Sequence, residues 1–193
     1  EFPDYQGFAG LSFSAATGRL YAASRYQPMS QSAVVRVLKI DPATMVTVGT
    51  GTYTPGYCNY CQTRVQGGAM SPDGADYVVY AITNQQTDED RGLHLLIHFD
   101  VTGTGVMTML GTLDVTALNA PSNGGVSMVL DDAGSLYVAF PTDNDTARTF
   151  KFNVSGAGIT QAASASYSPI QVHFKGGMGN LQLDPASGHL FEA

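Results

Sequence analysis

Apolar and polar residues alternate along most of the chain, in short runs separated by turn residues. Four segments share the order strand, tight turn, strand, and their turn glycines are spaced by 56, 60 and 54 residues: Gly18, Gly74, Gly134 and Gly188. A second hairpin follows each of the first three at matching phase, with Ile40, Phe99 and Phe152 at equivalent positions. Alternation with a period of two predicts β-strands, and no window has a helical period. The pattern therefore predicts units of four short strands, repeated about every 57 residues.

Four-stranded units of this length fit the blades of a β-propeller, in which radial repetition leaves only short, protected edges. We predict an all-β fold, a β-propeller-like array of four-stranded antiparallel blades in one domain over residues 1–193. The expected blades are three complete ones and half of a fourth, at residues 7–63, 64–121, 122–174 and 175–193. A β-sandwich or a row of hairpins is the alternative, because four-stranded units do not by themselves require radial closure.

The chain starts and stops in the same phase of the repeat. Residues 177–193 align without a gap on residues 7–23. Closed propellers usually need at least four blades. We therefore expect either a fragment whose remaining blades lie in a longer chain, or a subunit that its neighbours complete. In the second case the exposed edge at Leu190 and Phe191 would pair head-to-tail with another copy, giving a ring or a filament.

Several turn and strand motifs resemble those of a known group of repeat proteins. The SPDG sequence of Ser71–Gly74, the DPATM and DPASG turns and the LYVA strands resemble the repeats of secreted β-propellers of the YVTN, NHL and SMP-30 types. This resemblance implies blades rather than a reaction, because the motifs occur in proteins of unrelated activities.

The same resemblance supplies an enzymatic alternative. The lactonases of this group hold a metal in the central tunnel on acidic and amide side chains. Here the tunnel entrances have Asn123, Asn180 and His173, and no acid recurs at equivalent inner positions. Gly-Gly pairs recur instead, for example at residues 67–68, and indicate close packing around an axis or bulges. A fragment of a larger hydrolase of the lactonase or esterase type is the alternative function, and we assign no catalytic residue.

Charge and hydropathy exclude two classes of partner. The 193 residues include 9 basic and 16 acidic side chains, for a formal net charge of −7. Such a chain has no basic face for nucleic acid. No segment reaches the roughly 20 apolar residues that span a bilayer. Sequons at Asn144 and Asn153 predict N-linked glycans and a secreted or cell-surface location.

The two cysteines, Cys58 and Cys61, form a CxxC motif with three interpretations. A structural zinc site needs four ligands, and no second pair follows at the usual spacing. A thioredoxin-like centre needs a helix N-terminus in a βαβ setting, whereas a turn-rich loop precedes Cys58. We favour a small disulfide loop that stiffens the surface.

The long connections should lie together on one face of the propeller, which is where a binding site is expected. One of them has an aromatic and basic set suited to stacking on sugar rings or gripping a partner: Tyr53, Tyr57, Tyr60 and Arg64. The alternative is that these tyrosines only cover the edge of the core.

Metal and cofactor chemistry has little support. Acidic clusters at residues 88–91 and 143–145 have oxygen ligands of the kind that Ca²⁺ prefers, but neither has the spacing of an EF-hand. His94 and His98 lie about 13 Å apart along one strand, too far to share one metal. We expect no cofactor, with Ca²⁺ as the weak exception. The leading prediction is a module that binds or builds, as an adhesive, carbohydrate-contacting or fibre-forming subunit.

Overall fold

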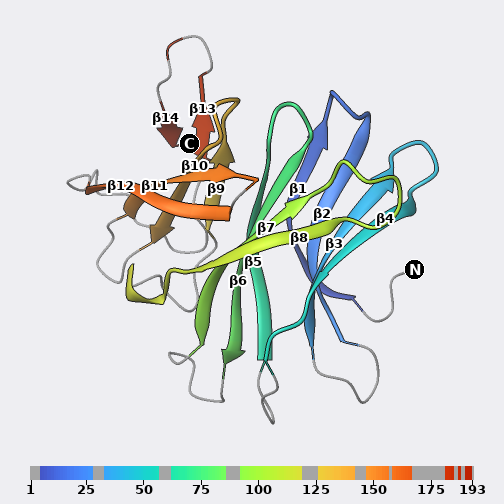
Figure 1. Cartoon of the computed structure of the whole chain (residues 1–193), viewed down its shortest axis with the longest axis horizontal. Helices are drawn as coiled ribbons and strands as arrows, with labels where there is room; N and C mark the ends of the chain where they lie inside the picture. Colours follow the sequence, from blue (N-terminus) through green and yellow to red (C-terminus); the bar gives the residue numbers. More distant parts are fainter. Residues whose placement is uncertain are drawn as a thin grey trace.

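The structure is a computed structural model, and its described residues are all-β apart from one short 3₁₀ turn at Thr116–Leu118. It describes residues 5–27, 33–56, 62–85, 92–118, 126–141, 147–156, 158–166, 181–184, 187 and 190–192. Within these residues there are three four-stranded antiparallel sheets and one two-stranded sheet, each following chain order (Figure 1).

We call the four-stranded sheets blades 1 to 3. Blade 1 consists of β1 (Tyr5–Ser14), β2 (Arg19–Tyr26), β3 (Val34–Asp41) and β4 (Val46–Tyr53). Blade 2 consists of β5 (Gln62–Met70), β6 (Asp76–Gln85), β7 (Leu93–Asp100) and β8 (Thr108–Asp114). Blade 3 consists of β9 (Ser127–Leu130), β10 (Ser135–Pro141), β11 (Ala147–Ser155) and β12 (Gly158–Ser166). The half-blade consists of β13 (Leu181–Leu183) and β14 (Leu190–Glu192).

Local hydrogen bonds explain why the turns form where the sequence predicts them. In the turn between β5 and β6, Ser71 Oγ accepts from the backbone N–H groups of Ala75 at 3.1 Å and Asp76 at 2.8 Å. The same hydroxyl donates to Asp73 Oδ1 at 2.6 Å. Gly74 has φ = +75°, a conformation that favours glycine. The SPDG motif is therefore a self-contained hairpin turn.

The innermost strands of successive blades lie side by side. β1 packs along β5, β5 packs along β9, and β13 lies beside β9. Leu181 N–H donates to Ser127 Oγ, which ties the half-blade to blade 3. The blades therefore stack face to face around their inner strands, as the propeller prediction requires.

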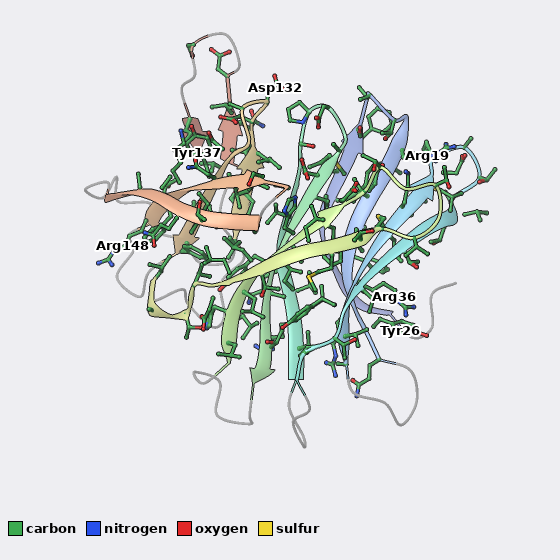
Figure 2. The ribbon with its side chains drawn as sticks, viewed as in Figure 1. Arg19, Tyr26, Arg36, Asp132, Tyr137 and Arg148 are labelled. Carbon is green, nitrogen blue, oxygen red and sulfur yellow. The ribbon has the colours of Figure 1, made fainter. Side chains whose placement is uncertain are left out.

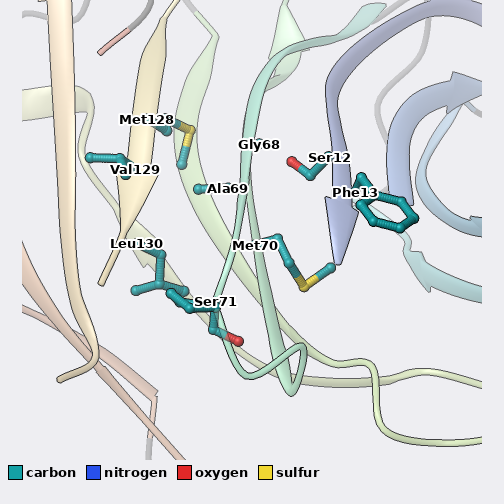
Figure 3. A pocket seen from close by; sticks show the side chains of 10 residues that line it. Ser12, Phe13, Gly68, Ala69, Met70, Ser71, Met128, Val129 and Leu130 are labelled. Carbon is teal, nitrogen blue, oxygen red and sulfur yellow. The ribbon is translucent and has the colours of Figure 1, made fainter. Parts of the chain in front are cut away.

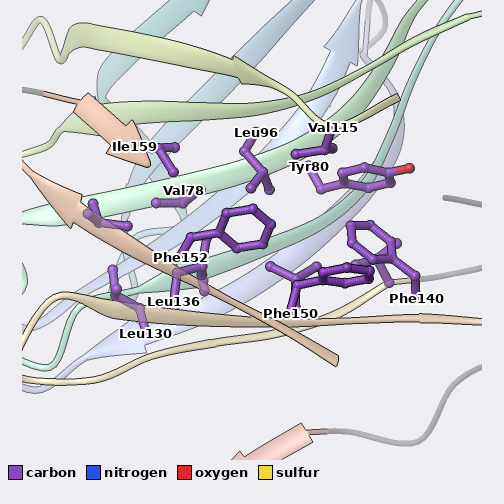
Figure 4. Close-up of a cluster of buried hydrophobic side chains, with 14 of the residues drawn as sticks. Val78, Tyr80, Leu96, Val115, Leu130, Leu136, Phe140, Phe150, Phe152 and Ile159 are labelled. Atoms are coloured by element: carbon purple, nitrogen blue, oxygen red, sulfur yellow. The ribbon is translucent and has the colours of Figure 1, made fainter. Parts of the chain in front are cut away.

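Two apolar cores fill the spaces between blades. The first joins blades 1 and 2 and includes Tyr21, Val37, Tyr77, Ile97 and Phe99. The second joins blades 2 and 3 and includes Val78, Tyr80, Leu136, Phe140, Phe150 and Phe152 (Figure 4). In the second core Tyr80 meets Phe140 edge-to-face at 5.3 Å between ring centroids. Blade 2 is thus buried on both faces.

Each blade has a leading face, toward the preceding blade, and a trailing face, toward the following one. Three opposed pairs hold equivalent places in the register: Leu20 and Ile40, Tyr77 and Phe99, Leu136 and Phe152. The second and third pairs pack against the preceding blade. By the same register Leu20 and Ile40 lie on the leading face of blade 1, turned away from blade 2.

Candidate binding surfaces

A buried lysine joins blade 1 to blade 2. Lys39 is almost fully buried, and its Nζ donates to the carbonyl oxygens of Val101 and Gly103, each at 3.1 Å. The ammonium group also lies 5.8 Å from the ring centroid of Tyr21, the residue opposite Lys39 in the ladder. A charged side chain buried in this way needs such partners. Lys39 therefore links the trailing face of blade 1 to the turn between β7 and β8.

Sequence reasoning missed this contact, although a signal for it exists. Blade 3 has the same opposed pair, Tyr137 and Lys151, and the Lys151 ammonium lies 5.4 Å from the Tyr137 ring centroid. Repetition of a Tyr–Lys pair at the same register position could have drawn attention to it.

Blade 2 also closes the outer edge of blade 1. Thr50 N–H donates to Gly105 O, and Met107 N–H donates to Thr50 O, both at 2.9 Å. Val106 thereby forms a parallel bridge with Thr50. A free sheet edge invites pairing with another chain, so this turn protects β4 along part of its length.

The two predicted strand histidines have different partners. His98 is fully buried, and its Nε2 lies 2.7 Å from Asp76 Oδ1. His94 Nδ1 lies 2.5 Å from the hydroxyl of Tyr80. Burial lowers the pKa of His94, an effect that the negative charge of Asp114 partly opposes. His94 is therefore neutral near pH 7 and can accept a hydrogen bond from Tyr80.

The predicted sugar-stacking set is described only in part. Tyr53 is the last residue of β4 and packs against the first core, where burial raises the pKa of its hydroxyl. Arg64 lies in β5, opposite Ile82. Its charge lowers the pKa of Arg25, although burial is the larger cause. Tyr57 and Tyr60 lie outside the described residues.

The long-connection end of blade 1 has a cation–aromatic pair. The guanidinium carbon of Arg36 lies 3.6 Å from the ring centroid of Tyr26, and the two side chains stand together at the lower end of the blade in Figure 2. At the opposite end, Arg19 pairs with Asp41 at 2.7 Å.

Of the other predicted site residues, Asn153 lies on a strand and the rest lie outside the described residues. Asn153 is exposed within β11, opposite Ser135 and Thr160, and Ser155 of its sequon is exposed at the end of the strand. The remaining candidates lie outside the described residues: Cys58, Cys61, Asn123, Asn144, His173, Asn180 and the acidic clusters at 88–91 and 143–145. Among the residues that the structure does describe, no group of three His, Cys, Asp or Glu side chains could hold a metal ion.

A groove of about 340 Å³ lies between the inner strands of the three blades (Figure 3). Its lining is mostly apolar, with two hydroxyl groups: Ser12, Phe13, Gly68, Ala69, Met70, Ser71, Pro72, Met128, Val129 and Leu130. Close backbone approach shapes this region. A Cβ added to Gly68 would lie 2.5 Å from the Tyr77 hydroxyl, and one added to Gly10 would lie 2.5 Å from the Gly68 Cα. The expectation of tight packing at residues 67–68 is met at Gly68.

The inner strand of blade 1 exposes three large apolar side chains. Phe8 is 50% exposed, Leu11 71% and Phe13 59%. Phe8 lies opposite Ser24 and Phe13 opposite Leu20, with Leu11 between them at a bulge. We call these three residues the β1 strip. Large contiguous apolar patches on a protein surface often mark interaction sites.

Comparison with known proteins shows the fold. No family model and no curated protein matches the chain. Among solved structures it is similar to the major allergen Mala s 1 of Malassezia sympodialis, with a TM-score of 0.55 and 14% identity. That protein has a β-propeller-like fold. This chain is likewise a β-propeller-like array.

The predicted fold class is thus confirmed. The match covers 96% of this chain and 56% of the allergen, so this chain spans little more than half the length of that structure. At this identity the likeness concerns the fold alone. Resemblance to the YVTN, NHL and SMP-30 types stays a prediction. In the described part of the chain, no helix is long and apolar enough to span a membrane.

Proposed function

We propose that this chain is a β-propeller-like binding and structural module that associates head-to-tail with further copies of itself. Its proposed setting is outside the cell or at the cell surface. Function then resides in the surface of the blades and in the contact between subunits.

One observation carries the proposal: the two ends of the blade array differ from its middle. Blade 2 is covered on both faces by its neighbours, with β6 buried from Tyr77 to Thr83. Blade 1 leaves the β1 strip exposed, and the described C-terminal sheet has only β13 and β14. Blades stack by burying one face against the next, so a face left open at one end fits a unit from another molecule.

The exposure of one sequon is compatible with the proposed setting. The side chain of Asn153 is exposed, as is that of Ser155, while Val154 between them is buried. A glycan on Asn153 would be accommodated in solvent beside the β11–β12 turn. Expression through a secretory host, followed by intact mass with and without glycosidase, tests this, with Asn153→Gln and Asn144→Gln as matched variants.

The long-connection face is the proposed ligand-binding surface. Tyr53 and Arg64 are half-buried there, and the same end of blade 1 has the Arg36–Tyr26 pair. Aromatic and guanidinium groups together suit sugar rings or a polar partner. A glycan array probed with the intact chain and with Arg64→Gln would identify such a ligand, because the variant should lose the binding that the intact chain shows.

The experiment that tests assembly is the particle mass of the native chain by light scattering, with electron microscopy of the same sample. Particles that grow with concentration into rings or filaments are expected. A monomer at all concentrations would overturn the proposal.

A second candidate follows from the 56% coverage of the allergen. In a larger propeller, further blades of the same protein would cover the exposed faces, and the chain alone would be monomeric. A hydrolase of the lactonase or esterase type is the enzymatic form of this candidate. Turnover of lactone and ester substrates by a longer parent protein, measured with and without Ca²⁺, would favour it.

A further inference from the structure

A basic residue occupies the same register position on the third strand of each of blades 1 to 3: Lys39, His98 and Lys151. Each one directly precedes a leading-face residue named above, so its own side chain is on the trailing face. In all three blades the pairing with the outer strand shifts at this position, which is a β-bulge. The residue opposite on the outer strand is small: Gly49, Gly111 and Ala163. Bulges that recur in this way are features of a fold and not defects.

Blade 1 shows what this position does when the next blade covers it. The Lys39 Nζ donates to the carbonyl oxygens of Val101 and Gly103, which belong to the turn between β7 and β8. The same turn fills the space beside Gly49, because a Cβ added there would lie 2.7 Å from Gly105 O. The lysine and the small residue together therefore receive the outer turn of the following blade.

The junction between blades 2 and 3 repeats half of this arrangement. A Cβ added to Gly111 would lie 3.7 Å from the Cα of Gly158, at the start of β12, so the outer turn of blade 3 again lies over the small residue. The basic residue differs, because His98 pairs with Asp76 of its own blade. The carbonyl-binding role is therefore one for lysine.

Blade 3 has the lysine form of the arrangement, and its outer part is open. The Lys151 ammonium lies 5.4 Å from the Tyr137 ring centroid, close to the 5.8 Å of the equivalent pair in blade 1. Lys151 is half-buried and Ala163 opposite it is exposed, whereas Lys39 is only 8% exposed. The half-blade takes up the inner side of blade 3, where β13 lies beside β9. What fits the outer side is a hairpin turn that presents backbone carbonyls.

The turn between β3 and β4 begins like the turn that Lys39 binds. Asp41 Oδ1 accepts from the Ala43 N–H, and Asp100 Oδ1 accepts from the Thr102 N–H, both at 2.9 Å. The two aspartates also hold the same place in the repeat, one residue after Ile40 and Phe99. The β3–β4 turn is thus the blade 1 counterpart of the β7–β8 turn.

This counterpart is exposed. Counted from the aspartates, the carbonyls equivalent to those that Lys39 binds belong to Pro42 and Thr44. Among the described residues, no backbone N–H group donates to either of them. Residues 42–46 are all exposed, with Met45 at 59% and Val46 at 57%, and the turn projects from the outer rim of blade 1 (Figure 1). A second molecule can therefore reach it.

We infer that Lys151 of one copy binds the β3–β4 turn of a second copy, by donating from its Nζ to the carbonyl oxygens of Pro42 and Thr44. This inference rests on the proposed function and names its interface. It repeats between molecules the contact that Lys39 makes within the chain. The two surfaces differ, so each copy binds one neighbour at each end. Hydrogen bonds from a charged donor give the contact its strength.

Sedimentation velocity of the full chain tests this interface with one variant on each side, Lys151→Met and Ala43→Trp. The first removes the donor, and the second places a large side chain on the exposed turn. We expect each to weaken association by about tenfold or more. Chains from a bacterial host are used, so that no glycan on Asn153 lies next to Lys151.

Two matched variants should associate like wild type. Arg148→Met removes the same charge from the same strand, but Arg148 is exposed on the other face, opposite Phe140 of the second core. Ala133→Trp changes an exposed turn of the same kind, because the Ala133 N–H donates to Asp131 Oδ1 at 2.9 Å. Thermal unfolding of dilute samples checks that each variant is folded.

Mixing the two interface variants gives a stricter result. The Lys151→Met chain keeps an intact β3–β4 turn, and the Ala43→Trp chain keeps its lysine. Their mixture should therefore form dimers that stop at two subunits. If wild type assembles but Lys151→Met assembles equally well, this interface is wrong while the proposed function stands. A wild-type chain that stays monomeric overturns both.

Discussion

Replacing Lys39 with Met removes the charged link between blades 1 and 2 while keeping most of the side-chain volume beside Tyr21. Two hydrogen bonds of 3.1 Å are lost, to Val101 O and Gly103 O. A hydrogen bond to a charged group contributes about 1.5–3 kcal/mol, and Val101 is fully buried, so water replaces the ammonium poorly at that carbonyl. Relief from burying a charge offsets part of this loss.

We therefore expect the free energy of unfolding to fall by about 2–4 kcal/mol. For a chain of this length that corresponds to a thermal midpoint lower by about 4–16 °C. Urea unfolding followed by far-UV circular dichroism measures the change in the free energy of unfolding, at a protein concentration low enough to prevent association. Lys151→Met is the matched control, because its lysine stands over Tyr137 in the same way but belongs to blade 3. That change should cost less than about 1 kcal/mol. Equal losses in the two variants would refute the role given to the Val101 and Gly103 carbonyls.

Three further predictions concern the inner strands, the buried histidine and the SPDG turn. Gly10→Ala should cost more than about 3 kcal/mol, because φ is +64° and the new Cβ would meet the Gly68 backbone at 2.5 Å. Gly7→Ala, with φ = +67° but nothing within 4 Å, should cost only about 1 kcal/mol, and similar urea midpoints for the two would contradict the steric argument. The lowered pKa of His94 means that the unfolded chain takes up a proton first, so stability should fall as the pH drops below the ordinary histidine value of about 6.5. Denaturation midpoints at several pH values check this, and a His94→Gln variant with the same slope would show that another group is responsible. Ser71→Ala should lower stability by about 1–2 kcal/mol, since Asp76 N–H loses its acceptor and Ala75 N–H keeps only Asp73 Oδ1, and an unchanged thermal midpoint would count against it.

Much of the local fold was predictable from the sequence, but the face that each residue occupies was not. Gly18, Gly74 and Gly134 marked their hairpins correctly, yet Gly18 and Gly74 sit at different places within their turns. In blade 1, Phe13 lies five residues before Gly18 and pairs with Leu20, which lies two residues after it. In blade 2, Met70 lies four residues before Gly74 and pairs with Tyr77, which lies three residues after it. A shift of one residue moves a side chain to the opposite face of a sheet. Tyr21 and Tyr77, each three residues after its glycine, therefore point to opposite faces of their blades.

The candidate site was less predictable than the fold. Tyr53 and Arg64 could be chosen for their chemistry, but only the structure shows Tyr53 packed against the first core. Lys39 looked like an ordinary strand lysine, because its carbonyl partners lie 62 and 64 residues away in the chain. The β1 strip was likewise hidden, since Phe13, Met70 and Leu130 look equally apolar in the sequence and differ only in what covers them.

The sequence by itself determined the strands, the hairpins and their repetition. Alternating side chains and turn residues such as Ser71 and Gly74 act through contacts a few residues apart. The strands and turns can therefore be predicted from short stretches of sequence. Only the tertiary structure decided how the blades meet. The approach of Gly10 to Gly68, the reach of Lys39 to Val101 and the exposure of Phe13 all depend on the angle and spacing at which one sheet stacks on the next. That stacking comes from burying many side chains at once, and no short stretch of sequence encodes it.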